Sequence, residues 1–324
     1  MLARMIAIGL LLICPLPALA QGIPGSWIDA WPETDFHRIE VDPREILSGG
    51  PQKDGIPAIT GPQMIEAAAE ETLDPREPVM VLALEGQRAR AYPVRYLMWH
   101  EIVNDEAGGV PVAVTFCPLC NSGLIFDRRL DGVVLEFGVS GMLRHSDMIM
   151  YDRQTHSWWQ QFQGRAIVGT LTGETLTALP ALLESWESYR SENPDGLVMA
   201  RPGGHMRAYG MNPYTGYDSG RPFLYRGEDP PHGIQPLARV VRVGNRAWPL
   251  TRLAEAGEIT EAGVRLTWAE GQASALDTGR IGEGREVGDV RVTDAATGAP
   301  VVHEVVFAFA FDAFEPEGEW MLGQ

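Results

Sequence analysis

One stretch, residues 112–161, organises the chain and reads VAVTFCPLCNSGLIFDRRLDGVVLEFGVSGMLRHSDMIMYDRQTHSWWQQ. It opens as an apolar strand that runs into the box Cys117-Pro118-Leu119-Cys120. Beyond the box, apolar runs alternate with turn signals such as Asp131-Gly132, where glycine accepts the positive φ of a tight hairpin. This pattern predicts a series of antiparallel strands. Further strands are expected over 146–152, 156–163 and 165–171.

A few short helices are expected around these strands. Thr60-Gly61-Pro62 has the form of a helix start, and residues 64–71 are good helix formers. A second helix is expected over 94–103, after a buried strand at 79–84, and a third from Pro180 to about Tyr189.

The C-terminal third resembles a degenerate copy of an earlier unit. Residues 90–94, followed by Leu97, match residues 246–250, followed by Leu253, at the same spacing. The next apolar strand leads to Cys117 in the first copy, whereas the second copy has no cysteine there. We therefore predict a mainly β (α+β) fold of antiparallel, barrel-like sheets with a few short helices and an internal duplication.

The same observations predict how the chain is divided. A loop rich in Gly, Pro, Tyr and Arg separates the two copies, and a loop of that length usually has a function or is an insertion. The expected segments are a signal peptide (1–20), a lead-in segment with one helix (21–77), a CxxC-bearing β-rich unit (78–200), a long loop or insertion (201–235) and a second β-rich unit (236–324).

The N-terminus has the order of a secretory signal peptide. Arg4 precedes an apolar run over 5–16, and Ala18-Leu19-Ala20 supplies a small-x-small cleavage site. We expect cleavage after about Ala20 and a periplasmic or secreted protein. No later apolar run approaches the ~20 residues of a spanning helix, so no membrane span is expected after cleavage.

The charge excludes some partners. The formal net charge is −17, and Lys53 is the only lysine. A chain this acidic is repelled by phosphate backbones and anionic lipid, so we expect no nucleic-acid partner.

Several cofactors and enzyme classes have no motif in this chain. There is no Walker loop, dinucleotide fingerprint, HExxH or GxSxG, so no nucleotide cofactor and no recognisable hydrolase, kinase or dehydrogenase is predicted. Haem attachment is excluded because Asn121, and not His, follows the second cysteine. A structural zinc ribbon would need a second CxxC.

The Cys117 and Cys120 pair is the candidate working centre. Two such thiols can close a disulfide, exchange with another dithiol or bind a soft metal. Met150, His145 and His156 lie nearby in sequence as weak candidate ligands, and soft donors of this kind favour Cu(I) over zinc.

The strand pattern separates these candidates. If 144–152 and 156–163 form a hairpin, Met150 and Trp159 share one face, while His145 and His156 share the other. Methionine beside tryptophan is more typical of core packing than of a metal site. Asp152 and Arg153 lie at the turn, where such residues usually bind their own backbone, although they would also suit a face turned towards the cysteines.

The ordered run FCPLCNSGLIFDR, LEFGVSG and SDMIMYDRQTHSWWQQ resembles the bacterial Domain of Unknown Function 3179 family. The resemblance extends from about residue 78 to the C-terminus, and it implies no settled activity. His145 and His156 stand where other polar residues are expected in that family. The residues on its motif positions are Cys117, Cys120, Asn121, Asp127, Gly138, Ser140, Gly141, Ser146, Met150, Tyr151, Asp152, Arg153, Thr155, Trp159 and Gln161.

Three functions remain open at this point. The favoured one is soft-metal (copper) binding or delivery by an exported protein, with a periplasmic redox or metal-handling protein as partner. The second is thiol-disulfide exchange, in which Cys117 and Cys120 would be catalytic. The third is a binding module in which the cysteines form a structural disulfide and the 201–235 loop makes the contact.

Overall fold

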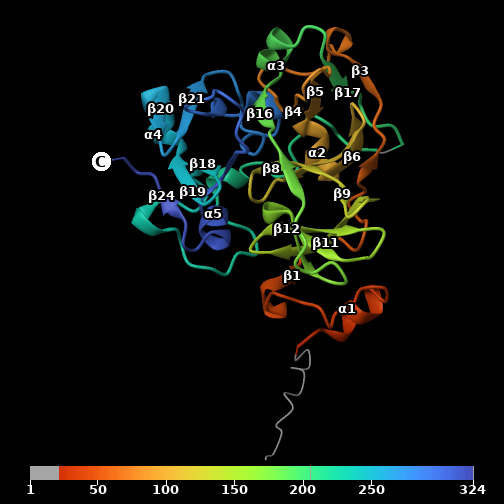
Figure 1. Ribbon diagram of the computed structural model, residues 1–324. Helices are drawn as coiled ribbons and strands as arrows, with labels where there is room; N and C mark the ends of the chain where they lie inside the picture. Colours follow the sequence, from red (N-terminus) through yellow and green to blue (C-terminus); the bar gives the residue numbers. More distant parts are fainter. Residues whose placement is uncertain (1–21, 205, 324) are drawn as a thin grey trace, which may run out of the picture.

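The structure is a computed structural model that describes residues 22–204 and 206–323 (Figure 1). The predicted signal peptide, residues 1–20, lies outside this range. Among the described residues, no helix is both long and apolar enough to cross a membrane. Short strands dominate the fold. The helices are α1 (Gly25–Ala30), α2 (Val94–His100), α3 (Trp186–Glu192), α4 (Leu250–Ala256) and α5 (Ala308–Phe314).

The first unit holds three five-stranded sheets. One has the order β16 (Leu182–Ser185), β4 (Pro78–Leu82), β5 (Arg90–Pro93), β17 (Leu197–Met199), β3 (Met64–Glu66). The next has the order β15 (Thr177–Leu179), β8 (Ser122–Asp127), β7 (Val110–Cys117), β6 (Ile102–Ala107), β2 (Ile59–Thr60). The third has the order β1 (Ile46–Ser48), β11 (Phe137–Arg144), β12 (Asp147–Asp152), β13 (Trp158–Gln160), β14 (Arg165–Val168). A two-residue ribbon pairs β9 (Arg129–Leu130) with β10 (Val133–Val134).

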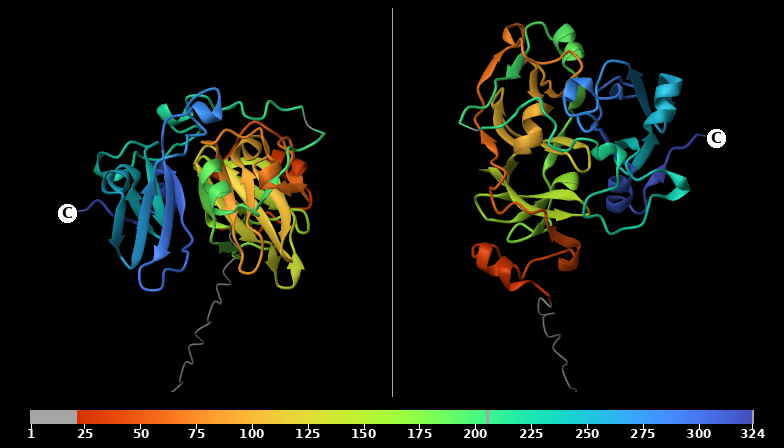
Figure 2. Two further views of the ribbon diagram at one scale, coloured as in Figure 1. Left: turned by 90° about the horizontal axis from the view of Figure 1, so that it is seen from above. Right: turned by 180° about the vertical axis from the view of Figure 1, so that it is seen from behind.

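The second unit lies beside the first and holds two smaller sheets (Figure 2). The larger has the order β23 (Glu304–Phe307), β18 (Arg239–Val243), β19 (Arg246–Pro249), β24 (Glu319–Trp320). The smaller has the order β20 (Glu258–Glu261), β21 (Val264–Ala269), β22 (Asp289–Asp294). The fold is thus mainly β, as the sequence predicted. In the described part of the chain the sheets are open, whereas the sequence suggested barrel-like ones.

The strand pairing of the two units supports the predicted duplication. The order β16-β4-β5-β17 recurs as β23-β18-β19-β24, with the last pair parallel in both. Likewise, the antiparallel run β6-β7-β8 recurs as β20-β21-β22. The first unit differs by the insertion of strands β9 to β15 between β8 and β16.

The helix predicted to start at Thr60 is wrong. Residues 64–66 form β3, which pairs with β17, and only a 3₁₀ turn follows at Ala67–Ala69. Strand pairing has overridden the helix propensity of this segment, as tertiary contacts often do. The α-helix of the lead-in is α1, where Trp27 packs on Trp158 with ring centroids 5.1 Å apart.

The helix predicted from Pro180 begins later. Residues 182–185 pair with β4 as strand β16, and the helix α3 starts at Trp186. Ser185 caps it, because its Oγ accepts the Ser188 N–H at 3.3 Å. The expected strand 156–163 is also shorter, since β13 gives way to a 3₁₀ turn at Gln161–Gln163.

Candidate metal centre

A tight turn between β7 and β8 holds the two cysteines. The Cys120 N–H donates to the Cys117 carbonyl oxygen at 3.3 Å, and the Asn121 N–H donates to the Pro118 oxygen at 3.3 Å. Asn121 completes the turn in the left-handed region, with φ 51°, a conformation that asparagine tolerates better than most residues. Cys117 and Cys120 are free thiols, 1% and 0% exposed.

The second unit fixes this turn from outside. The Phe307 N–H donates to the Cys120 carbonyl oxygen at 2.9 Å. Asn121 Nδ2 donates to the Val305 oxygen at 2.6 Å, and Ser122 Oγ donates to Glu304 Oε2 at 2.5 Å. Strand β23 therefore holds the cysteine turn in place through hydrogen bonds. Asn121 takes part in these bonds, which is a positioning role that the sequence did not specify.

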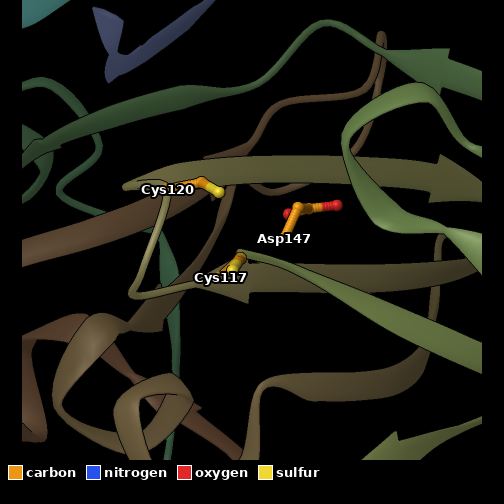
Figure 3. A group of neighbouring side chains, drawn as sticks. All are labelled: Cys117, Cys120 and Asp147. Atoms are coloured by element: carbon orange, nitrogen blue, oxygen red, sulfur yellow. The ribbon is translucent and has the colours of Figure 1, made fainter. Parts of the chain in front are cut away.

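Asp147, at the start of β12, joins the two thiols. Its carboxylate oxygen and the Sγ atoms of Cys117 and Cys120 all lie within 4.8 Å of one another. Figure 3 shows the three side chains gathered at one end of the β7–β8 hairpin. Across the described residues, this is the one such group of three His, Cys, Asp or Glu side chains.

The two carboxylate oxygens of Asp147 differ in their hydrogen bonding. Oδ2 accepts hydrogen bonds from Gln160 Nε2 at 2.6 Å and from the Phe162 N–H at 2.9 Å. Oδ1 is buried and has no hydrogen-bond partner within the described chain. A buried acceptor without a partner is costly, so Oδ1 is suited to receive a ligand.

Electrostatics make the ionised forms of these three side chains unfavourable. Burial raises the pKa of Asp147 to about 7. Burial also raises the pKa of both thiols, and the Asp147 carboxylate adds to the effect. Three acidic groups this close repel one another when ionised, and a bound cation would remove that cost.

Glu101 is a functional candidate that the sequence reading missed. It follows α2 with φ 59° and ψ −34°, is 8% exposed, and has a side chain that makes no hydrogen bond to any described residue. Burial and then the charge of Asp147 raise its pKa to about 8. The sequence repeat could have pointed to this residue. When the alignment of the two copies is continued, Glu101 lies opposite Gly257.

A cavity of about 300 Å³ adjoins the centre. Of the described residues that line it, Glu101 is the only charged one. Leu119 from the CxxC turn and Met148 next to Asp147 form part of its wall, and Tyr214, Tyr217 and Phe223 come from the long loop. The loop is therefore part of the site, although the sequence could not show what it contacts.

Hydrogen bonds hold the loop in place. Tyr217 Oη donates to the Leu119 oxygen at 3.0 Å and accepts the Phe223 N–H at 3.1 Å. Ser146 Oγ donates to the Phe223 carbonyl oxygen. The loop is thus tied to both the CxxC turn and the residue before Asp147.

The histidines and the methionine singled out from the sequence lie apart from this group. His145 Nε2 is 3.5 Å from Glu45 Oε2, and His156 Nδ1 is 3.0 Å from Lys53 Nζ. Met150 is fully buried and pairs with Trp159 across β12 and β13, which agrees with core packing.

The remaining candidates stabilise the inserted sheet. Asp152 accepts the Thr155 N–H at 2.6 Å and Trp159 Nε1–H at 2.9 Å. Arg153 pairs with Asp54 at 3.0 Å and with Glu136 at 3.2 Å. Ser140 Oγ donates to the Ile149 carbonyl oxygen.

Fold and site together define a two-unit, open-sheet β protein with a buried dithiol–carboxylate group. The family model described as a protein of unknown function (DUF3179) matches residues 53–318, and the chain belongs to this family. No curated protein and no solved structure matches the chain.

Proposed function

We propose that this is an exported protein that holds one metal ion between Cys117, Cys120 and Asp147. The observation that carries the proposal is the unpartnered Oδ1 of Asp147, buried beside two free thiols. The buried Oδ1 is costly without a partner, and one cation would satisfy it together with the two thiols.

The donor set favours zinc, with Cu(I) as the second candidate. The case for copper drew on Met148, Met150, His145 and His156, and neither histidine belongs to the group of three. Zinc takes thiolate and carboxylate ligands together, whereas Cu(I) is selected by soft sulfur donors. Three protein ligands would leave a fourth position for water or another ligand, as in catalytic zinc sites.

Thiol-disulfide exchange has less support. A reactive cysteine needs a lowered pKa and some exposure to its partner. Here burial raises the pKa of both thiols, and both side chains are covered. The same burial favours a resident metal over delivery to a partner, because release would require the 201–235 loop and strand β23 to move away.

Metal analysis of variants tests the proposal. The mature protein is purified from its exported compartment, and metal is counted in the wild type, Cys120→Ser and Asp147→Asn. The control is Asp127→Asn, which removes a carboxylate at the far end of β8 that pairs with Arg129. We expect about one zinc in wild type and control, and little in the other two. A wild type that takes up neither zinc nor Cu(I) under reducing conditions would refute the proposal.

A further inference from the structure

We infer that the cavity beside the metal centre binds a small, largely apolar molecule, and that Glu101 receives its one hydrogen-bond-donating or cationic head group. The inference deepens the proposed function and rests on it for the metal next to the pocket. Its own basis is the conformation, burial and surroundings of Glu101.

The backbone of Glu101 is strained, whereas the backbone at the equivalent position of the second unit, Gly257, is not. Glu101 and Gly257 end their helices with matching angles, φ 59° and ψ −34° against φ 71° and ψ −36°. Each N–H donates to a helix carbonyl, that of Leu97 or Leu253. Glycine takes this conformation readily, whereas a side chain there is unfavourable and often marks a functional site.

The side chain adds a second unfavourable term, the burial of a carboxyl group without a compensating hydrogen bond. The residue is 8% exposed, and its side chain lines the cavity and makes no hydrogen bond within the described chain. A structural glutamate would be expected to bond a backbone N–H or an arginine, as Glu304 does with Arg242 at 2.7 Å. Glu101 instead presents an unused acceptor to the cavity.

The lining of the cavity sets the chemistry of the occupant. In the part of the chain that the structure describes, no Lys, Arg or His lines the cavity, and the lining residues are mostly apolar or aromatic. Asp147 and the Cys117 thiol lie close enough to interact electrostatically with Glu101. An anionic head group would find no positively charged side chain among these residues, whereas an amine or hydroxyl group would bond to Glu101.

The volume limits the size of the occupant. About 300 Å³ is at the lower end of the range for small-molecule pockets. The Tyr217 hydroxyl is already engaged by Leu119 and Phe223, so it fixes the loop and is not a free contact for the molecule. The pocket therefore suits one aromatic or branched aliphatic group with a single polar head.

The test uses three probes with one ring and different heads: benzylamine, benzyl alcohol and benzoate. Each is titrated by calorimetry into the zinc-loaded mature protein, and zinc is counted in the same samples. We expect benzylamine and benzyl alcohol to bind at least about tenfold more tightly than benzoate. Glu101→Gln should weaken benzylamine by about tenfold and reduce this discrimination.

A cavity-filling variant and a surface control show whether the probes bind in this cavity. Ile56→Trp, at a partly buried position in the wall, should abolish binding of every probe, whereas Ile28→Trp on the exposed side of α1 should not. Equal binding of benzoate, no effect of Ile56→Trp, or no binding by a fully zinc-loaded protein would overturn the inference. Probe binding in a chain that takes up no metal would instead refute the metal proposal alone.

Discussion

Replacing Glu101 with glycine should make the protein more stable. Relief of the left-handed backbone is worth about 1–2 kcal/mol, and removal of a buried, unbonded carboxyl about 1–3 kcal/mol. Glycine reduces this gain by about 0.5–1 kcal/mol, because it has greater conformational freedom to lose from the unfolded chain. We expect a net gain of about 1–4.5 kcal/mol in the free energy of unfolding, with a Tm higher by roughly 2–7 °C for a chain of this size.

The control is Glu101→Ala, which removes the carboxyl but keeps a Cβ in the strained conformation. It should gain about 1 kcal/mol less than the glycine variant. Both are compared with the wild type by urea denaturation of the metal-free protein, so that metal binding does not contribute to the measured stability. If the glycine variant were less stable than the alanine variant, the backbone would not be strained. If both were less stable than the wild type, the carboxyl would be structural.

Three further outcomes follow from the described contacts. In the native metal-free protein, Cys117 and Cys120 should not react with a thiol reagent until the chain unfolds, and rapid reaction would contradict their burial. Tyr217→Phe should speed proteolysis of the 201–235 loop without changing global unfolding, because it removes hydrogen bonds worth about 1 kcal/mol each; an unchanged cleavage rate would contradict this. Burial raises the pKa of Glu184 from 4.5 to about 7 despite Arg291. In the folded protein Glu184 therefore keeps its proton to a higher pH than in the unfolded chain. The free energy of unfolding should fall by up to about 3 kcal/mol as pH rises from 4.5 through 7. Glu184→Gln should flatten that fall, and an unchanged pH profile would count against it.

The local patterns of the sequence were sufficient for the buried strands β4 and β7 and for the cysteine turn. Buried strands such as β4 and β7 are continuous apolar runs, and the CxxC box ends one of them. Helix propensity misled at Thr60, because pairing with β17 is a long-range contact that no local pattern contains.

The third candidate ligand could not be found in the same way. Side chains alternate along a strand, so Asp147 has the same face as His145 and the opposite face from Met150. The structure brings its carboxylate to the thiols, because β12 and the β7–β8 hairpin belong to different sheets that pack together. Contacts between sheets depend on the whole fold, so the strand period alone does not predict them.

Glu101 was within reach of the sequence. The aligned copies set a glutamate against a glycine at a helix end, a position where glycine is preferred for its positive φ. Such a departure from the local preference is where function is expected. Its burial and its cavity became visible only in the folded chain.

X-ray absorption spectroscopy at the zinc edge of the metal-loaded mature protein tests the proposed metal centre itself. We expect two sulfur atoms at about 2.3 Å and oxygen ligands at about 2.0–2.2 Å, with no imidazole scattering. Asp147→Asn should alter the oxygen shell while the sulfur shell of any metal it retains stays the same. A shell without sulfur, or one that contains histidine, would contradict a centre built from Cys117, Cys120 and Asp147.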